Sequence, residues 1–107
     1  MDANAEAHLL VEEAYTLHAA MGEECSALVA SALGSNRTGA LFRSDLRALC
    51  DRHRDTVREI LQRFLSADLA DFSDRDLRLI VSHIRFFRLV CPELADQILA
   101  SEFWRRH

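Results

Sequence analysis

Few residues of this chain have the type and spacing that catalysis or metal binding requires. Cys50 and His53 lie three positions apart and would share one face of a helix, so they suggest a metal site or an activated nucleophile. Either site needs a third group, and the sequence places no further ligand, base or orienting residue beside them. Adjacent carboxylates such as Glu12 and Glu13 point in different directions on a helix. We therefore expect no catalytic residue, no metal and no cofactor.

Arginine provides a second kind of chemistry, because it supplies all 13 cationic side chains and the chain contains no lysine. A stripe of four arginines, with only Ser82 among them, runs along one expected helix: Arg75, Arg78, Arg85 and Arg88. Guanidinium groups without intervening acids can bind phosphate groups or an acidic partner. The first 36 residues contain several acids and no arginine. Pairing of the stripe with those acids inside the protein is the alternative, and we favour it.

The same expected helix carries two apolar stripes, although a helix of a small bundle needs to bury only one. The second stripe contains Leu79, Phe86 and Val90. It is expected to meet the following helix, another subunit or a different protein. Trp104 is a further candidate, because tryptophan is a frequent interface anchor, although it could also close the core. We expect these four residues to form a partner interface.

The elements that position these residues are helices. Apolar residues at steps of three and four indicate one helix over residues 4–33. A second helix follows the loop 34–39 and ends at about residue 65. Gly34 is expected in the left-handed conformation that ends many helices. Two long helices joined by a short loop should lie antiparallel as a hairpin.

A shorter pair of helices follows. Ser73, with Asp76 three positions later, resembles an N-terminal cap, so the third helix is expected over residues 73–90. Pro92 suits the first turn of a fourth helix, which is expected to end at about residue 104.

These elements predict an all-α fold: a four-helix bundle-like single domain over residues 1–107, with a long antiparallel helical hairpin plus a shorter helix pair. An apolar fraction of 50 % suits one small core. The cysteines are odd in number and far apart, so Cys25, Cys50 and Cys91 are expected as reduced core thiols. No apolar run is long enough for a membrane span, and acids stand where a signal peptide has cations, which predicts a cytoplasmic protein.

The expected function is non-enzymatic. The leading hypothesis is a helical protein–protein interaction module, such as an adaptor, a small chaperone or an assembly subunit, that self-associates as a homodimer. The alternative is a small helical nucleic-acid-binding transcriptional regulator. A helix-turn-helix reader would need a small residue, a turn glycine and an apolar residue where the chain has Arg47, Asp51 and Arg52. The net charge of −4 also disfavours nucleic acid as the partner.

Overall fold

The computed structural model describes residues 3–35 and 39–101, which are largely helical. Four α-helices and one short 3-10 turn follow one another along the chain: α1 (Ala3–Ser35), α2 (Gly39–Ser66), η1 (Leu69–Asp71), α3 (Asp74–Phe87) and α4 (Pro92–Leu99). None of the described residues belongs to a strand. The prediction of an all-α, bundle-like fold is confirmed.

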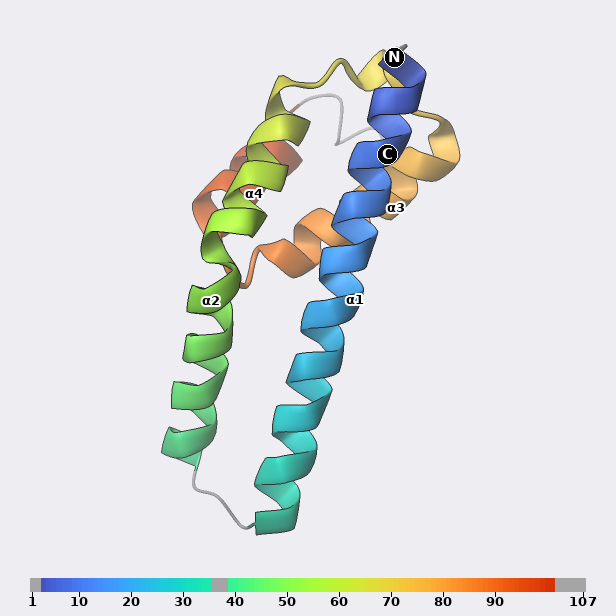
Figure 1. Cartoon of the computed structure of the whole chain (residues 1–107). Helices are drawn as coiled ribbons and strands as arrows, with labels where there is room; N and C mark the ends of the chain where they lie inside the picture. The colour runs from blue at the N-terminus through green and yellow to red at the C-terminus, as the bar shows by residue number, and fades with distance from the viewer. Residues whose placement is uncertain (1–2, 36–38, 102–107) are drawn as a thin grey trace.

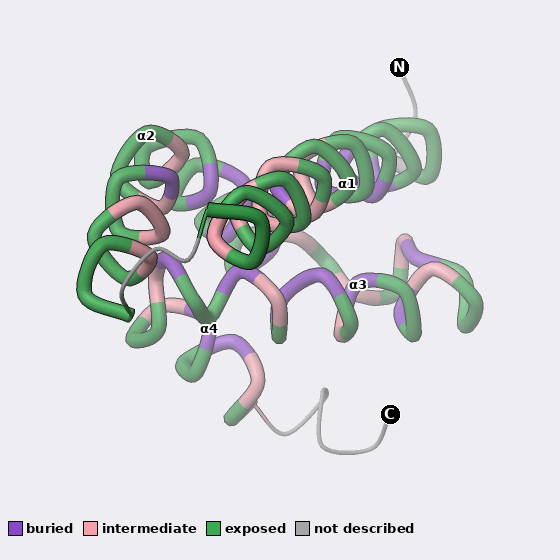
Figure 2. The backbone as a smooth tube through the Cα atoms, turned by 90° about the horizontal axis from the view of Figure 1, so that it is seen from below, coloured by how far each residue is buried: buried purple, intermediate pink, exposed green. Residues whose placement is uncertain are grey.

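The helices α1 and α2 form the long antiparallel hairpin that the sequence predicts (Figure 1). The helix α3 packs against α1, α4 packs against α2, and the two short helices also contact each other. Both short helices lie on the same side of the hairpin (Figure 2). They cover only the half that holds the start of α1 and the end of α2, so the other half projects as a bare helix pair (Figure 1). The molecule is therefore elongated, with extents of 49 × 25 × 22 Å.

Both short helices begin where the sequence predicts, and contacts within a few residues explain each start. The Oγ of Ser73 accepts a hydrogen bond from the backbone N–H of Asp76 at 3.1 Å, which satisfies a free donor in the first turn of α3. The helix α4 begins at Pro92, and the residue before it has φ −129°, outside helical geometry. The predicted end of α4 is wrong, because this helix stops at Leu99.

Two other predicted boundaries are also wrong. The helix α3 ends at Phe87, because the chain turns there and the N–H of Val90 donates to the carbonyl of Phe87 at 2.9 Å. The helix α1 continues through Gly34 to Ser35, so Gly34 does not adopt the left-handed conformation. The hydroxyl of Ser35 donates to the carbonyl of Ser31 at 2.6 Å, which bonds the last turn back to the turn before it.

The core lies between the covered half of the hairpin and the two short helices. The largest fully enclosed side chains are Phe64, Phe87, Met21, Leu49, Leu61, Ile80, Ile84, Ile98 and Val57. Among the described residues, the buried ones of α1 lie between Ala7 and Met21, and those of α2 lie between Leu49 and Phe64. No described residue from 22 to 48 is buried. The projecting half of the hairpin therefore contributes little to the core.

Candidate functional site

The arginine stripe of α3 is exposed, as the sequence predicts, but its expected internal partners are elsewhere. Only Arg88 has an acidic partner among the described residues: its Nε lies 2.6 Å from Oδ1 of Asp96 in α4. Within that part of the chain, Arg75, Arg78 and Arg85 have no carboxylate within ion-pair distance. Within the described ranges, these three guanidinium groups are therefore not neutralised by an ion pair.

Two acids of α1 pair instead with α2. Glu13 forms an ion pair with Arg63, and Oε2 of Glu24 lies 3.2 Å from Nη2 of Arg52. The favoured interpretation, in which the acids of α1 neutralise the α3 stripe, is therefore not what the structure shows. The cause is partly geometric, because α2 runs beside α1 over most of its length (Figure 1). Arg75 lines a hollow together with Glu12 of α1 but forms no ion pair with it, and Arg78 and Arg85 line a separate hollow on α3.

A shallow hollow of about 290 Å³ lies between two of the unpaired arginines. Arg78, Val81, Ser82 and Arg85 line it. The two arginines lie seven positions apart with the hydroxyl of Ser82 between them, so the donors of all three side chains occupy successive turns of one helix face.

The expected interface residues divide between surface and core. Leu79 has 40 % of its surface exposed, whereas Val90 has 6 % exposed and belongs to the core. The chain turns after Phe87, so Val90 no longer follows the helical register of α3, and its side chain is buried. The expectation that Val90 offers surface to a partner is therefore wrong. Phe86 is half-buried, because its ring stacks on His18 of α1 with centroids 4.0 Å apart. Trp104 lies outside the described residues.

Sequence reasoning missed Leu89, which is 66 % exposed directly after α3. Its spacing of four residues from Arg85 indicates that it lies on the same helix face as the arginine stripe. We name the exposed surface formed by these residues the α3 outer face; its members are Arg75, Arg78, Leu79, Ser82, Arg85 and Leu89.

A histidine pair joins α1 to α3 beneath this surface. Nδ1 of His18 lies 2.8 Å from Nδ1 of His83, so one ring donates its N–H to the lone pair of the other. His83 is 4 % exposed, and its Nε2 has no hydrogen-bond partner in the described part of the chain. Burial lowers the pKa of both rings, and the nearby His18 lowers the pKa of His83 further. Both rings are therefore held toward the neutral form, which suits a packing contact.

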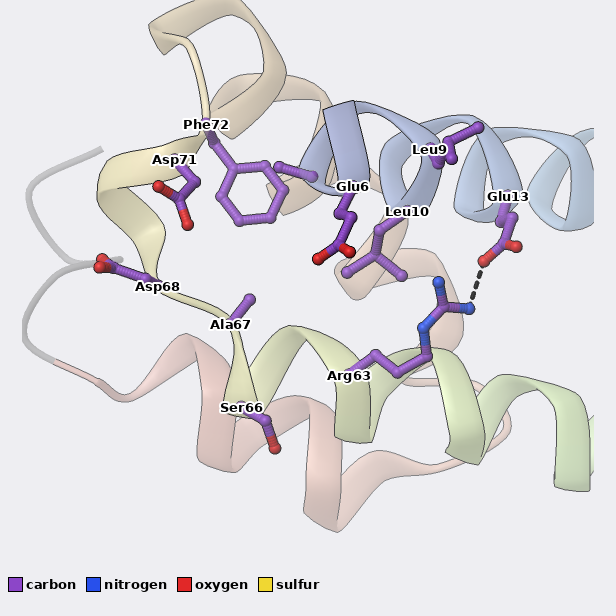
Figure 3. A pocket seen from close by; sticks show the side chains of 11 residues that line it. Glu6, Leu9, Leu10, Glu13, Arg63, Ser66, Ala67, Asp68, Asp71 and Phe72 are labelled. Carbon is purple, nitrogen blue, oxygen red and sulfur yellow. Dashed lines mark hydrogen bonds and ion pairs between the residues drawn. The ribbon is translucent and has the colours of Figure 1, made fainter. Parts of the chain in front are cut away.

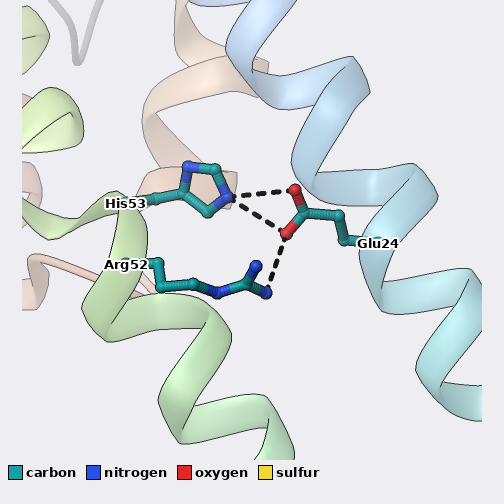
Figure 4. A network of polar contacts seen from close by, with 3 residues as sticks. All are labelled: Glu24, Arg52 and His53. Carbon is teal, nitrogen blue, oxygen red and sulfur yellow. Dashed lines mark hydrogen bonds and ion pairs between the residues drawn. The ribbon is translucent and has the colours of Figure 1, made fainter.

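Among the described residues, no hydrogen bond joins Cys50 to His53. His53 turns toward α1, where its Nε2 lies 3.1 and 3.3 Å from the two carboxylate oxygens of Glu24, beside Arg52 (Figure 4). Burial raises the pKa of the Cys50 thiol, which disfavours the reactive thiolate. Among the described residues, no group of three or more histidine, cysteine or acidic side chains is placed to hold a metal ion.

The three cysteines are free thiols that are half-buried against the core. Burial is the main cause that raises the pKa of each of them. The expectation that they are reduced thiols in the core region agrees with this placement. None has the lowered pKa that an activated nucleophile requires.

A larger hollow, of about 620 Å³, lies where the start of α1, the end of α2 and η1 meet (Figure 3). Leu10 and Phe72 supply apolar surface, and Arg63 spans to Glu13 at one side. The cation of this hollow is therefore already paired, and no unpartnered buried polar atom of the described residues lines it.

No protein-family model matches the chain, and no match was found among the curated proteins or among the solved structures. In the part of the chain that the structure describes, no helix combines the length and the apolar composition that a membrane crossing requires.

Proposed function

We propose that this protein is a non-enzymatic helical interaction module that binds an acidic, partly apolar segment of a protein partner on the α3 outer face. The observation that carries the proposal is the lack of acidic partners for Arg75, Arg78 and Arg85 among the described residues, while Glu13 and Glu24 of α1 pair with α2. Leu79 and Leu89 stand among these arginines and remain exposed.

The two residue types have different roles in such a contact. Burying the exposed part of each leucine supplies affinity in proportion to the apolar area removed from water. The guanidinium groups lie at the surface, where each ion pair contributes about 0.2–1 kcal/mol and chiefly fixes orientation and accelerates association. The surface is therefore suited to a partner that binds reversibly and that presents carboxylates beside a row of apolar side chains.

The state of the potentially reactive side chains supports a non-enzymatic role. Because burial raises the pKa of the three thiols, they are kept toward the protonated form. His83 is enclosed, and His53 contacts Glu24 on the neighbouring helix. A catalytic group needs access to a substrate together with a base or an orienting partner.

The α3 outer face also offers donors for phosphate groups, which is the basis of the alternative, a nucleic-acid-binding regulator. The exposed leucines favour protein, because phosphate backbones give apolar side chains nothing to bury against. The two possibilities predict different ligands and can be separated directly.

The test measures binding by fluorescence anisotropy to three labelled probes at low salt. The first is a helical peptide with leucines along one face and glutamates beside them, the second is the same peptide with glutamine in place of glutamate, and the third is a random-sequence DNA duplex. The proteins are the wild type, the double variant Arg78→Gln with Arg85→Gln, and a matched control, Arg54→Gln with Arg58→Gln. Both control arginines are exposed on α2 and form ion pairs with acids of their own helix.

We expect the acidic peptide to bind best and the α3 double variant to bind it about tenfold more weakly, as the loss of two surface ion pairs implies. The control variant should bind like the wild type. No binding of the acidic peptide, or an equal loss in both double variants, would refute a specific acidic site on α3. Binding of the duplex alone, lost with Arg78 and Arg85, would replace this proposal by the nucleic-acid alternative.

A further inference from the structure

A groove between α1 and α2 lies where neither short helix covers the hairpin. The hollow of about 620 Å³ at the start of α1 continues into a second one of about 570 Å³ farther along the two helices, and both are lined by Leu9, Glu13 and Arg63. No described residue of α3 or α4 lines either hollow. Along α1 the two hollows extend from Glu6 to Ala20, which is about 20 Å at 1.5 Å per residue. We name the two hollows together the hairpin groove.

The floor of the hairpin groove is apolar. Leu10 and Phe72 line its first hollow, Ile60 lines the second, and all three side chains are buried. Leu9 lines both hollows and keeps 42 % of its surface exposed, and Leu17 is half-buried. A ligand with an apolar face can therefore remove leucine surface from water in this groove.

The rim of the hairpin groove is acidic. Its acids come from α1, from α2 and from the segment around η1: Glu6, Glu12, Glu13, Glu59, Asp68 and Asp71. Arg63 is the cationic residue among the described lining residues, and it already pairs with Glu13. Figure 3 shows the carboxylates of Glu6 and Asp71 flanking the ring of Phe72. The charge of the rim is therefore strongly negative beside an apolar floor.

Several of these acids have no cationic partner within the chain. Among the described residues, no arginine or histidine lies within ion-pair distance of Glu6, Glu59 or Asp71. The remaining acids already contact a donor of this chain: Glu12 contacts His8, Glu13 contacts Arg63, and Asp68 contacts the backbone N–H of Ala70. The three unpaired carboxylates are therefore not neutralised by this part of the chain.

We propose that the hairpin groove binds a cationic amphipathic helix of a protein partner. Apolar side chains of that helix lie on the groove floor, and its arginines or lysines lie beside the acidic rim. A helix is the shape that fits, because two neighbouring helices leave a groove between them that takes the side-chain ridge of a third. A span of about 20 Å accommodates about 14 helical residues. This partner is opposite in charge to the segment proposed for α3, so the inference does not rest on that proposal.

Charge complementarity identifies this class of occupant. An acidic helix brings its own carboxylates close to those of the rim, and like charges close together oppose binding. A neutral apolar helix removes water from Glu6, Glu59 and Asp71 without supplying a partner, which costs free energy. A cationic helix supplies charged donors to the same carboxylates. It is therefore the kind of segment that the groove binds with the smallest cost of desolvation.

The test measures binding by fluorescence anisotropy to three labelled peptides at low salt. The first forms a helix with leucines along one face and arginines beside them, and the second has glutamine in place of arginine. The third has the composition of the first in a scrambled order without an apolar face. The proteins are the wild type and the double variant Glu6→Gln with Glu59→Gln. The matched control is Asp51→Asn with Glu93→Gln, which removes two charges from exposed residues outside the groove.

We expect the ordered arginine peptide to bind best and the Glu6 and Glu59 double variant to bind it about tenfold more weakly, as the loss of two surface ion pairs implies. The control variant should bind like the wild type. The scrambled peptide should bind weakly, because it cannot cover the leucines of the groove. No binding of the arginine peptide, equal losses in the two double variants, or equal binding of the scrambled peptide would each refute the inference.

A second pair of variants tests the position of the apolar contact. Leu9→Arg places a cation where the leucine lines both hollows, and it should weaken binding of the arginine peptide at least about tenfold. Leu33→Arg makes the same change at an exposed leucine of α1 outside the groove and should bind like the wild type. Circular dichroism confirms that both variants stay helical. A Leu9→Arg variant that binds the peptide as tightly as the wild type shows that the groove is not the site.

The α3 outer face of a second copy also carries arginines beside leucines, and light scattering distinguishes it from a separate protein. We expect the wild type to stay monomeric up to about 300 µM, or to form an oligomer that the Glu6 and Glu59 variant does not affect. Self-association that is lost both in this variant and in Arg78→Gln with Arg85→Gln would replace the separate partner by a second copy of this chain.

Discussion

The buried histidine His83 should make the protein less stable in mild acid. Its ring is enclosed and one nitrogen contacts His18, while the other nitrogen has no hydrogen-bond partner among the described residues. A proton on His83 therefore gains no hydrogen bond from the described residues at Nε2, and it has a second imidazole in direct contact. Desolvation first, and the charge of His18 second, lower the pKa of His83 below its ordinary value of 6.5.

The sign and size of the effect follow from proton linkage. As the pH falls through 6.5, His83 binds a proton in the unfolded chain but not yet in the folded chain. The free energy of unfolding therefore decreases. The contribution of neutral His83 to stability is fully present above the pKa that His83 has in the unfolded chain. It is lost as the pH drops toward the lower pKa that His83 has in the folded chain. Between about pH 7.5 and pH 5.5, the loss from His83 amounts to at most about 1.4 kcal/mol. His18 acts in the same direction, but solvent screens this half-buried ring and its share is smaller.

Urea unfolding followed by circular dichroism at several pH values between about 5.5 and 7.5 measures this loss. The variant His83→Leu has a similar volume and no titrating group, so its stability should change much less over the same interval. At about pH 7.5 it should match the wild type within about 1 kcal/mol, because the lost hydrogen bond is offset by removal of an unpartnered buried nitrogen.

The control is His8→Leu. His8 is mostly exposed, with 61 % of its side chain accessible, and this variant should keep the acid-induced loss of stability. A wild type whose stability does not fall between about pH 7.5 and 5.5 contradicts the reasoning. So does a His83→Leu variant that loses as much stability as the wild type, because the titrating group would then lie elsewhere.

Two further substitutions, each with a control substitution, test the assignment of core and cap. Phe87→Ala removes a fully enclosed ring and should lower the free energy of unfolding by about 3–5 kcal/mol, whereas Leu89→Ala, at a position that is 66 % exposed, should change it by less than about 1 kcal/mol. Equal losses in these two variants in urea unfolding would show that the boundary between core and surface is misplaced. Ser73→Ala removes the cap of α3 and should lower stability by about 0.5–2 kcal/mol, with Ser82→Ala, on the exposed face of the same helix, as a control that stays near the wild type.

The local chemistry of the chain can be read from its sequence. Apolar residues at steps of three and four predict the two long helices and their antiparallel pairing, because that spacing produces one apolar face. Ser73 and Pro92 predict the starts of α3 and α4, because each acts through contacts within a few residues. Helix ends are harder to predict. Gly34 suggests an end for α1, yet the helix passes through it, because glycine permits the left-handed conformation without requiring it.

Part of the candidate site can also be read from the sequence. The four arginines of the α3 stripe fall on one face by spacing alone, and the structure places all of them at the surface. Which of them has an acidic partner cannot be read in this way, because Arg88 meets Asp96 only once α4 has folded back beside α3. The charge imbalance between the first 36 residues and the rest indicates internal pairing, but it does not indicate which helix supplies the cations.

The amino-acid pattern alone specifies where this chain is helical, which residues could share a helix face, and that its cations are all arginine. Which face meets which neighbour depends on tertiary packing. That packing places Val90 in the core, stacks Phe86 on His18, and brings His18 to His83 from 65 positions away. The difference arises because periodicity fixes side chains relative to their own helix axis, whereas the rotation and crossing of one helix on another are set by the packing of both surfaces at once.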